Sequence, residues 1–92
     1  MGEGISVFEV RHADVDDILS IMEITREGFM KYSDMTGVKN LDALNETYDD
    51  VKYDIESKIV LIALSDGEPV GCVRVEVKDD NTAVLTRFAV KI

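Results

Sequence analysis

Cysteine and histidine are almost absent from the sequence, which contains one of each, Cys72 and His12. A single cysteine excludes an internal disulfide bond, and one Cys with one His excludes a Cys/His metal cluster, so we expect no metal. Long apolar runs are also missing, since no stretch approaches the roughly 20 residues of a membrane-spanning helix. Residues 1–4 lack the basic start and apolar stretch of a signal peptide. These absences predict a soluble, cytoplasmic protein with no membrane partner.

Positive charge is scarce, because 10 lysines and arginines face 19 acidic residues and leave a net charge of -9. Such a chain is repelled by phosphate backbones, so nucleic acid is not an expected partner. A cationic ligand, such as an amine or a basic peptide, would be attracted. The alternative is that the charge only keeps the protein soluble. Residues 1–58 carry a net of -8, from 14 acids and 6 bases, so the acidity belongs to the front of the chain.

The pattern at the front of the chain predicts one short strand followed by amphipathic helices. Residues 7–11 predict a first strand, and Asp14 followed by Asp17 predicts the capped start of a helix. Gly28 is expected to end or bend this helix. Its predicted buried stripe consists of Val15, Ile18, Leu19 and Met22, widened by Ile21 and Ile24.

Residues 29–40 are expected to form a loop, and a second helix is expected at about 41–57. The apolar side chains of that helix repeat at helical spacing, at Leu41, Leu44, Tyr48, Val51 and Ile55. We therefore expect Tyr48 to lie in the core. The acids between them, Glu46, Asp49, Asp50 and Asp54, predict either a solvated face or a surface that weakly attracts a basic partner.

From residue 59 the apolar pattern changes to that of strands. Residues 59–64 form a continuous apolar run, typical of a strand that is buried on both faces, and Asp66-Gly67 predicts a tight hairpin. Alternation of valines with Arg74 and Glu76 predicts a half-buried strand at 73–77. A turn at 79–81 then leads to a third strand at 83–90. The order β-α-α-β-β-β predicts one α+β domain over 1–92, with two helices packed on a mostly antiparallel sheet.

This order, with these residues, resembles the opening of the GNAT acetyltransferase fold. The resemblance lies in Val10-Arg11-His12-Ala13-Asp14 at the step into the first helix, in Pro69-Val70-Gly71-Cys72-Val73-Arg74 on the middle strand of the meander, and in Leu85-Thr86-Arg87-Phe88-Ala89-Val90 on its last strand. In the family a Gly-rich loop follows that last phrase and binds the pyrophosphate of coenzyme A. Residues 1–92 end before such a loop. The resemblance therefore implies the N-terminal half of an N-acetyltransferase, inactive by itself.

The resemblance also implies where a site would lie. The backbone of Phe88, Ala89 and Val90 would contact the pantetheine arm of acetyl-CoA, near a bulge of the last strand. The alternative is a plain core strand with Phe88 packed on the first helix. The acceptor wall of the family corresponds to Phe29, Met30 and Tyr32, for which ordinary packing is the alternative. The acceptor would be an amine on a small molecule or a peptide.

No catalytic residue is assigned by the sequence. Some family members carry a glutamate base on the last strand, but residues 83–90 contain no acid. Glu76 on the preceding strand is expected to face solvent. His12 is expected to have a capping or surface role, and Cys72 to be a core residue rather than a reactive thiol.

Two further possibilities concern the whole chain. It could be a non-catalytic interaction module or a folding fragment that forms a homodimer through the last strand, residues 83–92, because an unpaired apolar edge strand invites pairing with another chain. It could also be a different small α+β domain, in which 59–90 is not a three-stranded meander.

Overall fold

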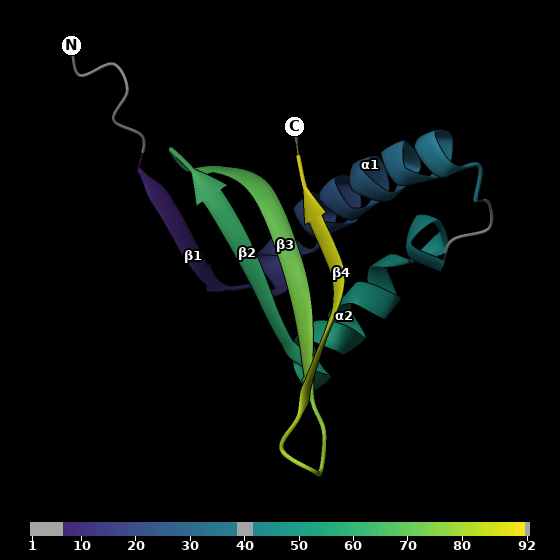
Figure 1. Cartoon of the computed structure of the whole chain (residues 1–92). Helices are drawn as coiled ribbons and strands as arrows, with labels where there is room; N and C mark the ends of the chain where they lie inside the picture. Colours follow the sequence, from purple (N-terminus) through teal and green to yellow (C-terminus); the bar gives the residue numbers. More distant parts are fainter. Residues whose placement is uncertain (1–6, 39–41, 92) are drawn as a thin grey trace.

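The structure is a computed structural model that describes residues 7–38 and 42–91, and it places two helices on one face of a four-stranded sheet (Figure 1). The strands are β1 (Phe8–His12), β2 (Ile59–Ser65), β3 (Glu68–Val77) and β4 (Ala83–Val90). The helices are α1 (Ile18–Thr36) and α2 (Tyr48–Ser57), each preceded by a 3₁₀ turn, η1 (Val15–Asp17) and η2 (Asp42–Asn45). Each strand runs antiparallel to its neighbour in the order β1-β2-β3-β4, which confirms the predicted α+β arrangement.

The step from β1 into the first helix is fixed by carboxylates. The backbone N–H of Asp16 donates to Asp14 Oδ1 at 2.9 Å, and the N–H of Asp14 donates to Asp17 Oδ2 at 2.9 Å. This reciprocal pair is the predicted capping box, and it satisfies donors that a helix start leaves free. The guanidinium of Arg11 binds the same Asp17 carboxylate through two hydrogen bonds, of 2.8 and 3.0 Å. The end of β1 is thereby tied to the start of the helix.

Helix α1 is longer than predicted. It runs through Gly28 to Thr36 and is capped by Gly37, which has the left-handed φ of 76° that glycine adopts without steric cost. The expected loop at 29–40 is therefore wrong for residues 29–36, and 39–40 lie outside the described residues. The buried stripe also has a different phase, because Leu19 is 70% exposed while Ile18, Ile21, Ile24 and Thr25 are buried.

The predicted second helix is two pieces. The 3₁₀ turn η2 ends at Asn45, and Thr47 caps α2, since its hydroxyl accepts from the N–H of Asp50 at 3.2 Å and Asp50 accepts from the N–H of Thr47 at 3.0 Å. The break changes the phase of the apolar stripe, so Tyr48 begins α2 and is 46% exposed rather than core. Val51 is fully buried, and Leu41 lies outside the described residues.

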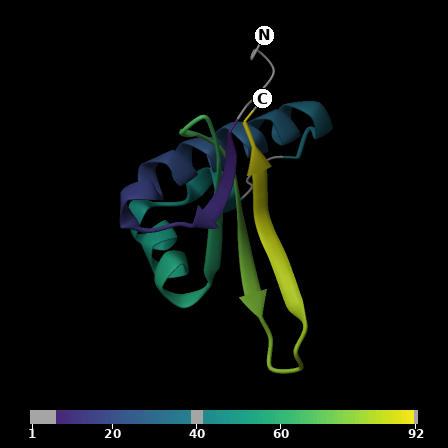
Figure 2. The same ribbon diagram turned by 90° about the vertical axis from the view of Figure 1, so that its left-hand side faces the viewer.

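Both turns of the predicted meander are present. Asp66 and Gly67 have φ values of 51° and 85°, the two left-handed residues of a tight hairpin turn, and Asn81 at φ 65° lies in the turn before β4. On β2 the residues Val60, Ile62 and Leu64 are buried against the helices. The expectation of burial on both faces is wrong, because in the described part of the chain the helices cover one face only (Figure 2).

The other face of the sheet is open and apolar. Strand register places on it the side chains of Phe8, Val10, Leu61, Ala63, Val73, Val75, Leu85, Phe88 and Val90. Phe8, Leu85 and Phe88 are each more than 60% exposed there. Exposed apolar faces of this extent are uncommon on monomeric soluble proteins. Within the described residues, no helix is both long and apolar enough to cross a membrane.

Candidate functional site

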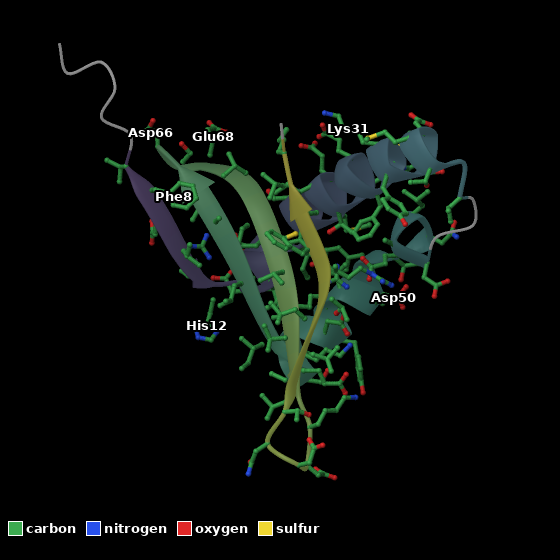
Figure 3. The ribbon with its side chains drawn as sticks, viewed as in Figure 1. Phe8, His12, Lys31, Asp50, Asp66 and Glu68 are labelled. Carbon is green, nitrogen blue, oxygen red and sulfur yellow. The ribbon has the colours of Figure 1, made fainter. Side chains whose placement is uncertain are left out.

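A hollow of about 330 Å³ lies between the C-terminal half of α1 and the end of β4, and a volume of that size can hold part of a small ligand. Its lining consists of Gly28, Phe29, Lys31, Tyr32, Met35, Phe88, Ala89 and Val90. It therefore brings together both groups of residues that the sequence singled out, except Met30, which is 47% exposed and not in the lining. Figure 3 shows Lys31 on α1, to the right of the end of β4.

Strand β4 carries a bulge beside this hollow. Cys72 pairs with Ala89 and Arg74 pairs with Thr86, so the single residue between them on β3 faces two on β4, Arg87 and Phe88. Arg87 has a φ of 52°, and it is the one non-glycine residue with positive φ in a strand of the described structure. The extra residue shifts the alternation of side chains by one position. Thr86 pairs with Arg74 on the helical face. Without the extra residue, Phe88 would lie on the same face as Thr86, because side chains two positions apart in a regular strand share a face.

The bulge decides which side chain meets α1. Phe88 is 69% exposed and lies on the open face, so the alternative of a plain core strand with Phe88 packed on the first helix is wrong. Ala89 takes the inward position and is 4% exposed. A Cβ atom on Gly28 would lie 3.1 Å from that of Ala89, so the two small residues let the helix approach the strand closely. This contact forms the floor of the hollow and explains why a glycine lies inside the helix.

The end of β4 is held on the helix by a lysine. Lys91 Nζ lies 3.0 Å from Glu23 Oε1 and 3.8 Å from Glu27 Oε2, both on α1. The hydrogen bond and negative charge of Glu23 raise the pKa of Lys91. The N–H of Lys91 donates to the carbonyl of Val70 at 2.6 Å. Because β4 is the last strand in the sheet order, the outer backbone groups of residues 88–90 have no neighbouring strand among the described residues.

The lining of the hollow limits its chemistry. Apolar side chains dominate it, with the amine of Lys31 and the phenol of Tyr32 as its polar side-chain groups and no carboxylate. It can hold a flexible apolar chain beside a free strand edge, whose N–H groups can bond a ligand carbonyl. It offers no carboxylate base for an amine. The described residues also contain no group of three or more His, Cys, Asp or Glu side chains that could hold a metal ion.

The other candidates lie away from the hollow. His12 is exposed at the end of β1, in agreement with a surface role (Figure 3). Glu76 pairs with Lys78 at 3.3 Å, and both side chains are nearly half exposed. Cys72 is buried at 3.5 Å from the hydroxyl of Thr25, and burial raises the pKa of its thiol. Cys72 is therefore the predicted core residue, since its thiolate is disfavoured.

A buried arginine cluster is the feature that the sequence pattern did not reveal. Arg74 on β3 is 1% exposed, and its guanidinium binds Asp54 at 2.8 Å and Glu46 through both terminal nitrogens, at 2.7 Å from Nη2 and a shorter contact from Nη1. Glu46 also accepts from Nε of Arg87 at 3.3 Å. The expected solvated acidic face is therefore wrong for Glu46 and Asp54, whose side chains are 10% and 14% exposed.

The cluster also determines which face of β3 is buried. Burial alone lowers the pKa of Arg74, but the hydrogen bonds and charges of Glu46 and Asp54 outweigh that effect and raise it. The arginine is therefore charged, and it lies on the helical face while the valines lie on the open face. Nε of Arg74 is buried and has no hydrogen-bond partner among residues 7–38 and 42–91. The sequence signal for this cluster was the excess of acids around Glu46 and Asp54, together with Arg74 inside a predicted strand of valines.

The sequence matches no protein-family model, and no curated protein matches it either. Solved structures match in fold. PaiA N-acetyltransferase from Thermoplasma acidophilum, solved in complex with coenzyme A, superposes with a TM-score of 0.77 at 16% identity over 92% of this chain. A predicted acetyltransferase from Clostridium acetobutylicum, solved with acetyl-CoA, gives 0.67 at 14% identity over 92% of this chain.

The chain has the fold of the N-terminal part of a GNAT acetyltransferase. It spans 59% and 60% of the lengths of those two structures, so the likeness concerns a partial GNAT fold. The order of elements predicted from the sequence agrees with this fold. The binding roles assigned by resemblance to Phe88, Ala89 and Val90, and to Phe29, Met30 and Tyr32, remain predictions.

Proposed function

We propose that this chain forms the acceptor-side wall and the thioester-facing strand of an acetyl-CoA-dependent N-acetyltransferase. The hollow between α1 and β4 carries the proposal, because it joins Phe29 and Tyr32 to the free edge of Phe88–Val90 in one cavity. Both structural neighbours were solved with coenzyme A or acetyl-CoA, which supports the same class of co-substrate here.

The proposed reaction is acyl transfer from a thioester to an amine. The pantetheine arm would lie along the outer edge of β4, whose N–H groups would bond its amide carbonyls and polarise the thioester carbonyl. Phe29 and Tyr32 would orient an acceptor amine beside the thioester. Since the hollow contains no carboxylate, the amine proton would leave through water or through a group outside the described residues. The net charge of -9 would favour a cationic acceptor, either a small amine or a basic peptide.

A titration tests this proposal. The full product of the gene and residues 1–92 alone are each titrated with acetyl-CoA by calorimetry, with coenzyme A as a second ligand. We expect saturable binding at micromolar concentration by the full product and none by 1–92, because the pyrophosphate contacts of the family lie beyond the matched segment. Acetyl transfer is then measured on polyamines and basic peptides. The proposal fails if the full product neither binds acetyl-CoA nor acetylates any amine.

A non-catalytic interaction module is the second candidate, and the open face favours it. Phe8, Val10, Phe88 and Val90 are each half or more exposed on this face, next to a hollow of about 310 Å³ that they help to line. Here β4 of one copy would pair with β4 of a second copy, so that edge and face are covered together. Sedimentation equilibrium of 1–92 tests this candidate. A monomer at millimolar concentration would exclude it, and a dimer that is lost on Leu85→Lys substitution in β4 would support it.

A further inference from the structure

Arg87 has a backbone conformation that its own side chain does not favour. Left-handed φ angles in a bulge are adopted freely by glycine, and a residue with a Cβ atom adopts them at a cost. Of the three such residues in the described structure, Asp66 and Asn81 lie in turns. Arg87 lies inside β4, so the surrounding contacts must hold it there.

Those contacts come from Glu46. Its carboxylate lies 3.3 Å from Nε of Arg87, and the same carboxylate is held by both terminal nitrogens of Arg74. Arg74 in turn is fixed by Asp54 of α2 at 2.8 Å. The carboxylate of Glu46 thus joins the buried guanidinium of Arg74 to the side chain of Arg87.

We infer that Glu46 is a positioning residue, which holds the bulge of β4 by its pair with Arg87 and so sets the direction of Phe88, Ala89 and Val90. Loss of the pair would let β4 return to regular register. Phe88 would then point at α1 and Ala89 at the open face, because one residue of slip exchanges the faces. This role rests on the proposed function for the use of the strand, but the geometry can be tested without any ligand.

Nuclear magnetic resonance of 1–92 provides the test. The bulge has three signatures: the left-handed coupling constant of residue 87, a contact between the Ala89 methyl and the α protons of Gly28, and a contact between the Phe88 ring and Val73. In Arg87→Met we expect the coupling constant of residue 87 to shift toward the larger value of a regular strand, the contact between Ala89 and Gly28 to weaken at least twofold, and the Ala89 amide to exchange at least about tenfold faster. In Arg87→Gly all three signatures persist, because glycine keeps the conformation without the pair.

Glu46→Gln keeps the shape of the side chain and removes its charge, and it decides the question if Arg87→Met does not fold. Glu46→Gln should change the same signatures in the same direction as Arg87→Met. Glu76→Gln, which breaks an exposed pair on the neighbouring strand, should leave them unchanged. Intact signatures in both Arg87→Met and Glu46→Gln would overturn the role. Failure of the full product to bind acetyl-CoA would instead overturn the proposed function, and it would leave this result standing.

Discussion

Gly28 and Ala89 lie so close together that a methyl group added at position 28 would lie 3.1 Å from the Cβ atom of Ala89. The two residues are 61 positions apart in the chain, one inside a helix and one on an edge strand. Their contact sets the distance between α1 and β4, and hence the floor of the hollow.

Gly28→Ala is expected to destabilise the fold by about 1 kcal/mol. The substitution gains up to about 1 kcal/mol of helix propensity, but overpacking against a buried strand costs about 1–3 kcal/mol. Urea denaturation of the single variants and of the double variant with Ala89→Gly provides the measurement. In the Ala89→Gly background the same change should become stabilising, by about 0.5–1 kcal/mol. A stabilising Gly28→Ala in the native background would show that the contact is looser than the structure indicates.

Arg74→Met is expected to cost about 3 kcal/mol of unfolding free energy, because it leaves Glu46 and Asp54 without their shared cation in a mostly buried place. A folded unit formed by 92 residues has little stability to lose, so the midpoint in urea should fall steeply. Lys78→Met is the matched control, since its pair with Glu76 is half exposed and should be worth less than about 1 kcal/mol. Equal effects of the two substitutions would contradict a buried cluster.

Local signals in the sequence predicted the order of elements well. The capping box of Asp14 and Asp17 and the hairpin at Asp66-Gly67 each depend on residues within four positions of one another, so a pattern can reveal them. The continuous apolar run of β2 likewise predicted a strand. These local signals were enough for the α+β class and for the resemblance to the GNAT fold.

The errors arose where distant contacts outweigh local pattern. Gly28 continues a helix because Ala89 requires a small neighbour there, and no periodicity within α1 carries that information. Arg74 faces inward because its partners lie 20 and 28 positions before it in the chain. Phe88 faces outward because a bulge shifts the strand by one residue. Most of the residues that line the hollow were singled out only through the family resemblance, since its two walls lie 50 or more residues apart.

Acid should weaken the fold partly through Asp17. The hydrogen bond from Arg11 lowers the pKa of Asp17 below its ordinary value of about 3.9. A carboxyl group whose pKa is depressed by folding contributes stability above its unfolded pKa and loses it as pH falls through the folded pKa. We expect the urea midpoint to fall from pH 5 to pH 3, and Asp17→Asn to lower the midpoint at pH 5 and flatten part of that fall. An identical fall in wild type and Asp17→Asn would exclude this role.

Cys72 should be slow to react with thiol reagents in the folded chain. Burial raises the pKa of its thiol and also blocks access, so modification requires local opening. At pH 8 the reaction with a disulfide reagent should be at least about tenfold slower than in the chain unfolded by guanidinium chloride. Prompt, stoichiometric reaction of the folded chain would place Cys72 at the surface.

Phe88→Ser distinguishes the bulged strand from a regular one. With Phe88 69% exposed on the open face, the substitution should change the unfolding free energy by less than about 1 kcal/mol. In a regular strand the ring would pack on α1, and its loss would cost about 3–5 kcal/mol, as expected for large-to-small changes in a core. Ile62→Ala, at a fully buried position of β2, provides the scale for such a loss at about 2–5 kcal/mol. Because Phe88 contributes to the apolar face, Phe88→Ser should also reduce binding of a hydrophobic dye, whereas a core position would leave dye binding unchanged or raise it through partial unfolding.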